Sequence, residues 1–305
     1  MKPLCASQQS RTESRKPASD AAAGSGGFTV VAATLEEWTQ VAEWANEEGW
    51  NVGVNDVRCF HPTDPDGFFI GRIGSRPVSA LSVVNYSDRY AFAGHYLVPE
   101  AYRGLGLGLA LWEAALPHAG TRTVGLDAMP AQQANYEKSG FFPVYDTYRY
   151  SGRFERPGAV APGTVRVGPR DLDAVAAYDR TYFPADRRAF LSRWLAAPGH
   201  RAYARLTDGR ITGYGVIRPA HRGHRIGPLF AETPHDTEAL FDSLTAHLGP
   251  DEEVSLDVPE PQRAAGALVR ERGLRQEFRT VRMYTGPVPG SRAECAGAIT
   301  SLELG

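Results

Sequence analysis

A glycine-rich loop is the segment of this sequence that most directly indicates chemistry. Residues 103–108 read Arg-Gly-Leu-Gly-Leu-Gly, after an apolar run that ends at Pro99. The residues that follow have helical spacing, with apolar side chains at Leu109, Leu111, Trp112, Ala115 and Leu116. Glycines let backbone N–H groups approach an anion closely, and the N-terminus of a helix adds a partial positive charge. We therefore predict that this loop holds a pyrophosphate.

Three kinds of cofactor site use such a loop. A P-loop requires Gly-Lys-Ser/Thr at the helix start, and Leu107-Gly108-Leu109 does not provide it. A Rossmann site requires Gly-x-Gly-x-x-Gly in a parallel βαβ unit, but the third glycine position is Leu109. The strands predicted before the loop are also joined by turns, as in an antiparallel sheet. The pattern that remains is Arg-x-x-Gly-x-Gly.

Hydrophobic periodicity predicts the elements that position this loop. Thr34 and Glu37 have the spacing of a capping box, so we expect a helix that starts after Thr34 and stops near Gly49. A second, short helix is predicted over residues 132–142, ended by Gly140. Runs with strand character cover residues 28–33, 67–73, 76–86, 90–98, 121–129 and 143–152.

The second half of the chain repeats this order. Residues 123–132 (TVGLDAMPAQ) are similar to residues 253–262 (EVSLDVPEPQ), and Asp127 and Asp257 are 130 positions apart. The strand ends YRYSG and VRMYTG are also similar, and they are separated by nearly the same number of positions as Asp127 and Asp257. Two landmarks in the same order indicate an internal duplication. Chance similarity between strand–turn–helix units is the alternative.

These patterns predict an α/β fold of two domains, which a length of 305 residues allows. The predicted division is a disordered tail over residues 1–27, a first domain over 28–152, a Pro- and Gly-rich linker over 153–163, a second domain over 164–288 and a flexible tail over 289–305.

The composition is that of an ordinary soluble protein, with 42% hydrophobic residues, 22% charged residues and a formal net charge of -2. This balance argues against a nucleic-acid partner. We see neither an apolar run long enough for a membrane span nor the apolar core of a secretory signal, so we expect a cytoplasmic protein with no membrane partner. The cysteines Cys5, Cys59 and Cys295 fit no disulfide framework or zinc pattern, and we predict no metal.

Two motifs resemble those of the GNAT acyltransferases. Residues 97–112, LVPEAYRGLGLGLALW, resemble the acetyl-CoA-binding motif of this family, and residues 135–142, NYEKSGFF, resemble its following helix with Tyr-x-x-x-Gly-Phe. The upstream EEGWNVGVND and the duplicated second half resemble the bacterial tandem GNAT proteins. The resemblance covers residues 28–288. It implies two tandem GNAT-like domains, each with a mostly antiparallel, splayed sheet flanked by helices.

The resemblance also implies a binding mode for acetyl-CoA. The pantetheine arm would lie along the strand before the loop, against backbone groups of Leu97 and Val98, and Asn135 is a weaker candidate for a contact with the same arm. The pyrophosphate would be held by Arg103, Gly104, Leu105, Gly106, Leu107 and Gly108.

Tyr136 matches the family's frequent tyrosine near the cofactor sulfur. A phenol at that place can protonate the thiolate that an attacking amine expels. The other interpretation is a packing tyrosine on a short helix. Because a free alkyl ammonium titrates near pH 10, some group must also take the proton of the acceptor. Asp127 and His95 are the candidate bases. Three alternatives stay open: a base that acts through a water molecule, a turn-capping role for Asp127, and a position on the strand surface for His95.

The acceptor site implied by the resemblance includes Trp50, Asn51 and Asp56, with Tyr86 and Tyr148 as further candidates for the same cleft. Asp56 could pair with a substrate ammonium or cap a turn. The two tyrosines could equally be sheet aromatics.

The predicted activity is therefore transfer of an acetyl group from acetyl-CoA to a primary amine of a small molecule. A protein amine as acceptor and a CoA-binding module without turnover are the alternatives, and the sequence leaves the oligomeric state open. Only the first domain is expected to bind the cofactor. In the second, Arg225 replaces the first glycine of the motif, and Glu232 and Asp236 stand where phosphates would lie.

Overall fold

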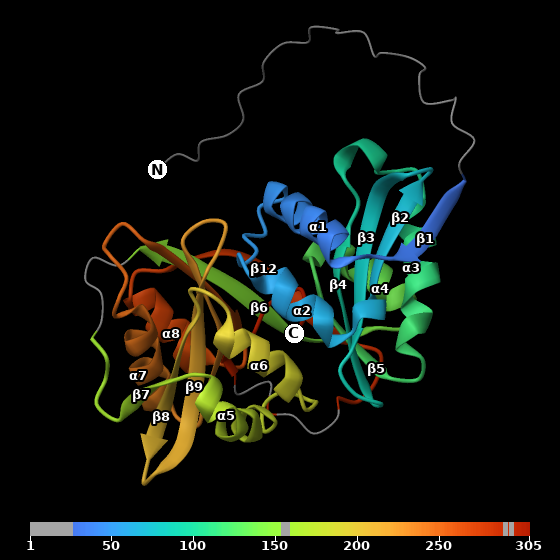
Figure 1. Ribbon diagram of the computed structural model, residues 1–305. Helices are drawn as coiled ribbons and strands as arrows, with labels where there is room; N and C mark the ends of the chain where they lie inside the picture. The colour runs from blue at the N-terminus through green and yellow to red at the C-terminus, as the bar shows by residue number, and fades with distance from the viewer. Residues whose placement is uncertain (1–26, 154–158, 289–291, 293–295) are drawn as a thin grey trace, which may run out of the picture.

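The computed structural model describes residues 27–153, 159–288, 292 and 296–305, and it shows two similar halves (Figure 1). The strands of the first half are β1 Phe28–Ala32, β2 Phe68–Ile73, β3 Arg76–Asn85, β4 Tyr90–Leu97, β5 Thr123–Ala128 and β6 Phe142–Arg153. Its α-helices are α1 Leu35–Glu47, α2 Asp56–Phe60, α3 Leu107–Ala115 and α4 Gln133–Lys138.

The second half follows a similar order. Its strands are β7 Thr164–Val167, β8 Arg201–Thr207, β9 Arg210–Pro219, β10 His224–Ala231, β11 Glu253–Pro259 and β12 Arg275–Tyr284. Its α-helices are α5 Leu172–Asp179, α6 Arg188–Ala196, α7 Pro234–Thr245 and α8 Arg263–Glu271. The predicted landmarks Asp127 and Asp257 lie at equivalent places in β5 and β11, as expected for a duplicated unit.

One continuous sheet runs through both halves, in the order β1-β2-β3-β4-β5-β12-β6-β11-β10-β9-β8-β7. The pairs β4–β5 and β10–β11 are parallel, and the other neighbours on this path are antiparallel. The last strand of each half pairs with the preceding strand of the other half, so β6 and β12 are exchanged at the centre of the molecule (Figure 1). The predicted mixed sheet flanked by helices is present. The exchange was not expected, because strand pairing across halves leaves no local pattern in the sequence.

Buried ion pairs accompany the exchange. Arg282 of β12 donates to both carboxylate oxygens of Asp127 in β5, at 2.9 and 2.7 Å. Arg149 of β6 donates to both oxygens of Asp257 in β11, at 2.7 and 2.9 Å. These four side chains are at most 4% exposed. Removing one partner of such a pair leaves a buried charge uncompensated, so the pairs help to specify which strands are neighbours.

Local signals act as predicted at the ends of the helices. Thr34 accepts from the backbone N–H of Glu37 at 3.2 Å, while Glu37 accepts from the backbone N–H of Thr34 at 2.9 Å, which is the expected capping box at the start of α1. Gly49 follows that helix with φ of 82°, and Gly140 follows α4 with φ of 85°. Both angles are in the left-handed region, where glycine ends helices without steric strain.

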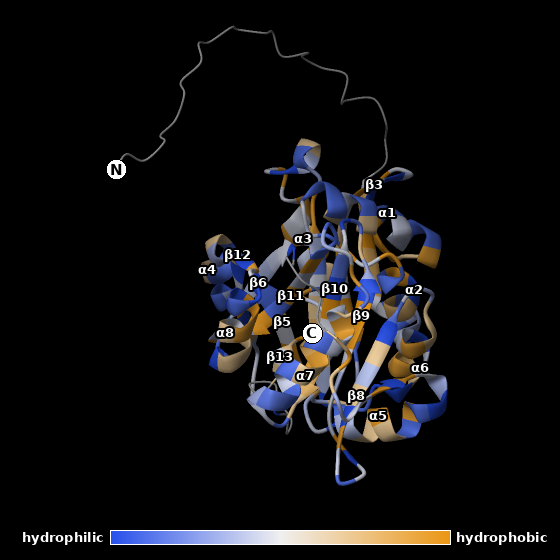
Figure 2. Ribbon diagram, turned by 90° about the vertical axis from the view of Figure 1, so that its left-hand side faces the viewer, coloured by the Kyte–Doolittle hydropathy of each residue, from blue (hydrophilic) through white to orange (hydrophobic). Residues whose placement is uncertain are grey.

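Apolar clusters cover the two faces of the sheet. One cluster joins both halves through Trp38 of α1, Phe60 of α2, Tyr178 of α5 and Trp194 of α6. The helix α3 packs on the other face of β3, over Leu81 and Val83. In Figure 2 the short helix α4, which has no buried residue, is drawn largely in blue.

Each half contains a pair of parallel strands that separate. Strands β4 and β5 pair only as far as Phe92 and Gly125, and β10 and β11 pair only as far as Ile226 and Leu256. In the second half the gap is filled by the short strand β13, Ala296–Ala298, which pairs with Leu229 and Phe230 of β10. The backbone N–H of Ile299 then donates to Asp257 O of β11 at 3.0 Å. The splayed gap of the first half instead forms a cavity.

The predicted flexible tail is corrected by this arrangement for residues 296–305. They pack into the interior because Ala296, Ala298, Ile299 and Leu304 offer apolar side chains to the second-half cleft and to the interface, where each is at most 4% exposed. Three parts of the predicted division lie outside the described residues. They are residues 1–26 of the predicted N-terminal tail, residues 154–158 of the predicted linker, and the rest of the predicted C-terminal tail except residue 292. Within the described part of the chain, no helix is both long and apolar enough to cross a bilayer.

Candidate active site

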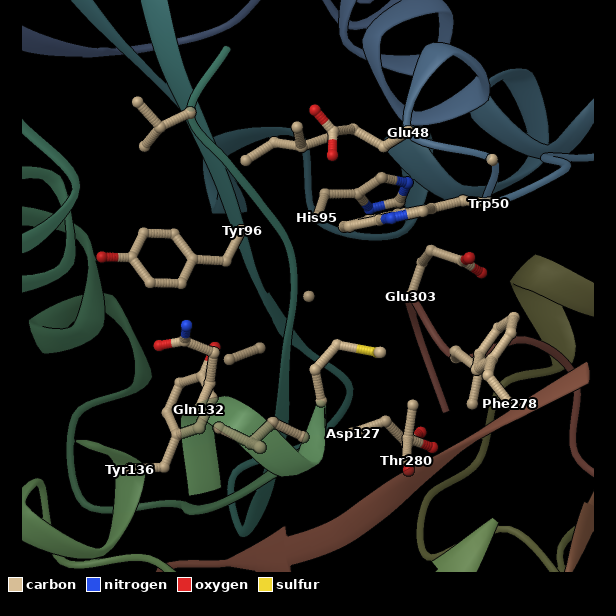
Figure 3. Close-up of a pocket in the computed structure, with 18 of the residues that line it drawn as sticks. Glu48, Trp50, His95, Tyr96, Asp127, Gln132, Tyr136, Phe278, Thr280 and Glu303 are labelled. Atoms are coloured by element: carbon tan, nitrogen blue, oxygen red, sulfur yellow. The ribbon is translucent and has the colours of Figure 1, made fainter. Parts of the chain in front are cut away.

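A cavity of about 620 Å³ occupies the splayed gap between β4 and β5, a size typical of small-molecule sites. One wall is formed by consecutive residues 93–98 of β4 and its continuation, and another by Leu126 and Asp127 of β5. Figure 3 shows Tyr96, Gln132 and Tyr136 at one end of the cavity, with Phe278, Thr280 and Glu303 toward the other. The second half supplies the latter three residues, so the cavity is a shared chamber of both halves.

The glycine loop lies at the predicted place, between β4 and α3. Gly104 and Gly106 have φ of 78° and 77°, and no described atom lies within 4 Å of the position that a Cβ would take at either residue. Gly106 immediately precedes α3, so no side chain caps the first N–H groups of that helix. An exposed turn with free backbone donors at a helix N-terminus is suited to a phosphate group.

Val98 and Arg103 connect this loop with the cavity, which both of them line. The Arg103 Nε donates to Val98 O at 2.8 Å, and its guanidinium also forms an ion pair with Glu48 after α1. Leu97, a predicted contact of the pantetheine arm, lines the cavity. Residues 104–108 lie outside its lining; Gly104, Leu105 and Gly106 are exposed, and Leu107 and Gly108 are half-buried. The cavity and the loop therefore form one continuous path, as an extended ligand with a charged end would require.

Tyr136 and Tyr96 stand at the loop end of the cavity. The ring of Tyr136 packs against Trp112 of α3, with ring centroids 5.4 Å apart, and Trp112 also contacts Tyr96. Burial raises the pKa of Tyr136 and of Tyr96. Tyr136 is thus a protonated phenol at neutral pH, facing the cavity from an aromatic cluster. Its predicted role as proton donor and its alternative role in packing are both compatible with this geometry.

His95 lies in the middle of the cavity wall and has a backbone φ of 48°, which is uncommon for a residue with a side chain. The pairing of β3 with β4 shifts register between Ala80 and Ser82, so β4 bulges at this place. The His95 Nδ1 is 3.4 Å from Ser82 Oγ. Burial lowers the pKa of His95, although Glu303 and Asp56 act in the opposite direction, so the imidazole is neutral at pH 7.

Asp127 reaches the cavity wall, but its carboxylate has both oxygens engaged by Arg282. Burial raises the pKa of Asp127, and Arg282 opposes this shift. A guanidinium that compensates the charge of a carboxylate opposes its protonation. The geometry therefore favours a structural role for Asp127, which holds the exchanged strand β12 in place, over the predicted role as general base.

Of the predicted acceptor residues, only Trp50 lines the cavity. Asn51 exchanges hydrogen bonds with the backbone of Arg222, at 3.1 and 2.7 Å. Asp56, 1% exposed, is bonded by both oxygens to Arg218. These placements correct the predicted acceptor roles of Asn51 and Asp56. Both residues bond to partners across the interface between the halves, and those partners are more than 160 positions away in the sequence.

Tyr86 and Tyr148 lie outside the cavity lining as well. The Tyr86 hydroxyl donates to Leu304 O at 2.8 Å, so this residue holds the C-terminal segment rather than a ligand. The Tyr148 hydroxyl donates to Asp146 at 3.3 Å. Asn135 is exposed and donates to the side chain of Gln132 at 2.9 Å. Gln132, rather than Asn135, reaches the cavity.

Several cavity residues were missed by sequence reasoning. Those from the first half lie near the predicted motifs: Glu48, Tyr96, Trp112, Met129 and Gln132. The others come from β6, β12 and the C-terminal segment: Arg149, Phe278, Thr280, Leu302 and Glu303. The available signal for the last two was the run of small and apolar residues 296–302, which is unusual for a flexible tail.

The second half has a different structure at the equivalent places. Its helix α7 begins after Thr233, whose hydroxyl accepts from the backbone N–H of Asp236 at 3.1 Å. Asp236 pairs with Arg205, and Glu232 pairs with Arg210. This helix start is already capped and carries carboxylates, and β13 fills the gap between β10 and β11. Among the described residues of both halves, no cluster of three or more His, Cys, Asp or Glu side chains is arranged to hold a metal ion.

Comparison with known proteins places both halves in one family. Residues 35–141 match the model of the acetyltransferase (GNAT) family, and residues 175–295 match a model of an acetyltransferase (GNAT) domain. The chain is 35% identical over 278 residues to the holothin acyltransferase of Pseudoalteromonas sp. (strain SANK 73390), covering 91% of this chain and 95% of that protein.

Solved structures have the same fold. A putative acetyltransferase from Pyrococcus horikoshii superimposes with a TM-score of 0.76 at 24% identity, over 92% of this chain and 96% of that one. A tandem GNAT protein from the clavulanic acid biosynthesis pathway superimposes with a TM-score of 0.58 at 17% identity, over 86% of this chain and 99% of that one.

Proposed function

Because the chain belongs to the GNAT acetyltransferase family and is an acyltransferase, we propose that it transfers an acetyl group from acetyl-CoA to a primary amine of a small molecule. The observation that carries this proposal is the path from the exposed glycine loop into the cavity between β4 and β5. One end of the path suits a phosphate-bearing ligand, and the other is a chamber closed by the second half.

The residues present fit acetyl-CoA. Gly104 and Gly106 keep the turn open, and the uncapped start of α3 offers backbone N–H groups to the pyrophosphate. The separated strand β4 leaves backbone groups of Leu97 and Val98 for the pantetheine arm. When bound, acetyl-CoA supplies an activated acyl group. The chain would hold that group in the cavity beside Tyr136.

Tyr136 is the proposed proton donor to the departing thiolate. Its raised pKa keeps the hydroxyl protonated at neutral pH, as a donor requires. The contact with Trp112 fixes the ring at the loop end of the cavity, where the thioester of a ligand running along β4 would arrive.

A small acceptor is favoured because the far end of the cavity is walled by Phe278, Thr280, Leu302 and Glu303. A lysine or N-terminus of a folded protein would need a more open groove. The similarity to a holothin acyltransferase, over nearly the full length of both chains, supports acyl transfer to a small molecule as well.

A panel of primary amines tests the proposal. Purified protein is incubated with acetyl-CoA and pooled alkylamines, arylamines and lysine-containing peptides, with thiol release and product mass as readouts. We expect N-acetylation of one or more small amines. Acetylation confined to the peptides would favour the protein acceptor, and acetyl-CoA binding without thiol release would favour a binding module. Offering longer acyl-CoA donors in parallel determines the length of the acyl group.

A further inference from the structure

Glu303 is a buried acidic residue in the cavity, and no sequence motif points to it. It follows β13 in the C-terminal segment and is 4% exposed. Its backbone is held firmly: a Cβ on Gly94 of β4 would lie 1.8 Å from Glu303 O, so only glycine allows this approach. The hydrogen bond from Tyr86 to Leu304 O fixes the next residue. The position of Glu303 in the chamber is therefore set by both halves.

The carboxylate of Glu303 has a buried oxygen without a hydrogen-bond partner among the described residues. Its Oε1 lies 3.7 Å from Arg225 Nη1, which is beyond hydrogen-bonding distance, and its Oε2 has no hydrogen-bond partner among the described residues. Buried carboxylate oxygens are normally satisfied, because an unpaired one loses its hydration without replacement. A missing partner at the wall of a ligand cavity indicates that the ligand supplies it.

The other carboxylates that line the cavity are engaged. Asp127 has both oxygens bonded to Arg282, and Glu48, which is partly exposed, is paired with Arg103. Asp257, next to the chamber, accepts from both Arg149 and Arg225, and these arginines lower its pKa to about 2 although burial acts in the opposite direction. Two guanidinium groups thus share one carboxylate, and Glu303 offsets the remaining positive charge while keeping Oε2 free.

We propose that Glu303 binds the ammonium group of the acceptor and takes its proton. This inference rests on the proposed amine acetylation and assigns a residue from the C-terminal segment to it. An ammonium group is strongly attracted to a carboxylate in a partly dehydrated chamber. The ring of Trp50 and that of Phe278 line the same chamber and would contact the carbon skeleton of the acceptor.

The Glu303 carboxylate takes one proton from the alkylammonium and leaves a neutral amine. The amine nitrogen forms a bond to the acyl carbon, the bond from that carbon to sulfur breaks, and the sulfur leaves with the electron pair. The second proton lost by the nitrogen goes to that sulfur by way of Tyr136. The proton on Glu303 then passes to solvent, and the carboxylate is restored.

Charged acceptors depend on this residue more than neutral ones. An alkylamine is protonated at pH 7 and needs both the attraction and the proton transfer. An arylamine is already neutral at that pH and needs neither. The structure therefore assigns an alkylamine as the acceptor class. The charged or titratable groups around Glu303 are Arg225 of β10, Asp127 of β5, Arg149 of β6 and His95 of β4.

The test compares Glu303→Gln and Glu303→Asp with wild type and with Glu277→Gln, which removes an exposed carboxylate from β12. An alkylamine and an arylamine from the amine panel serve as acceptors. For Glu303→Gln we expect kcat/KM for the alkylamine to fall about 10²–10⁴-fold, with a smaller change for the arylamine. Its rate with the alkylamine should rise with pH toward the pKa of the free amine, and Glu303→Asp should recover part of the lost rate. Glu277→Gln should match wild type.

Binding measurements separate this role from a structural one. Titration calorimetry should show unchanged affinity of Glu303→Gln for acetyl-CoA and weaker binding of the alkylammonium. Two outcomes overturn the assignment of Glu303 without touching the proposed function. One is an equal loss of kcat/KM with both acceptor classes, and the other is an unchanged kcat/KM for the alkylamine while acetyl-CoA still binds. If wild type releases no thiol with any amine, the proposed function itself fails, and the role of Glu303 fails with it.

Discussion

At the scale of single residues, burial decides which side chains in the cavity can exchange protons. Tyr136 stays protonated because a phenolate would lose its hydration among Trp112 and Phe141. Asp127 was a reasonable candidate base from its place at the end of a strand. Its bidentate partner Arg282 compensates its charge and holds both oxygens in place. His95 is neutral and buried on the cavity wall, where it remains a candidate to assist the acceptor.

Tyr136→Phe isolates the proton donor, because the substitution keeps the ring and its packing and removes only the hydroxyl. With a confirmed amine substrate we expect kcat to fall about 10²–10⁴-fold, while the affinity for acetyl-CoA changes little. Tyr148→Phe is the matched control, since its hydroxyl lies outside the cavity on β6. A kcat equal to that of wild type would leave Tyr136 with a packing role only.

At the scale of elements, the glycine loop and α3 form a unit that was fully visible in the sequence. Two left-handed glycines turn the chain from β4 into the helix, and the helix start is left uncapped. The equivalent helix α7 has a threonine cap and nearby carboxylates instead. The start of α3 therefore leaves backbone donors open to an anion, whereas a side chain already occupies a donor at the start of α7.

Gly106→Glu tests the loop. The variant places a carboxylate at the proposed pyrophosphate position and forces a side chain onto a residue with φ of 77°, so we expect acetyl-CoA affinity to fall below detection by calorimetry. Gly106→Lys imposes the same backbone strain with the opposite charge and should retain more affinity. Gly209→Glu is the control, because Gly209 has φ of 75° and an open Cβ position in a turn of the second half. Equal affinities for Gly106→Glu and wild type would exclude the loop as the phosphate site.

At the scale of the whole molecule, the two halves are interlocked rather than merely linked. Strands β6 and β12 cross into the opposite half, and each carries an arginine that pairs with the aspartate of its new neighbour. The C-terminal segment adds a further link. It fills the splayed gap of the second half with β13 and then brings Leu302 and Glu303 to the cavity of the first.

One acetyl-CoA should bind to each chain, because the gap between β10 and β11 is occupied by β13 and the start of α7 is already capped by Thr233. Titration calorimetry on the full chain should give a stoichiometry of about one. The same titration on Gly106→Glu should show no binding, which would place the single site in the first half. Two equivalent sites per chain, or a site that survives in Gly106→Glu, would contradict this prediction.

The sequence by itself determined the parts that depend on near neighbours. The capping box at Thr34, the glycine turn before α3 and the stop at Gly140 each depend on residues within a few positions, so their patterns are legible without the fold. The duplication was legible too, because Asp127 and Asp257 keep equivalent places in similar segments.

Only the tertiary structure decided the partners of those residues. Asp127 and Arg282 are 155 positions apart and meet because β12 pairs with β5, whereas Asp56 and Arg218 are 162 apart and meet where the two halves pack together. The same holds for Glu303, whose backbone is placed by its contact with Gly94 on a distant strand. A buried polar group is stabilised by whichever partner the packed fold brings to it, and the sequence around that group contains no record of that partner.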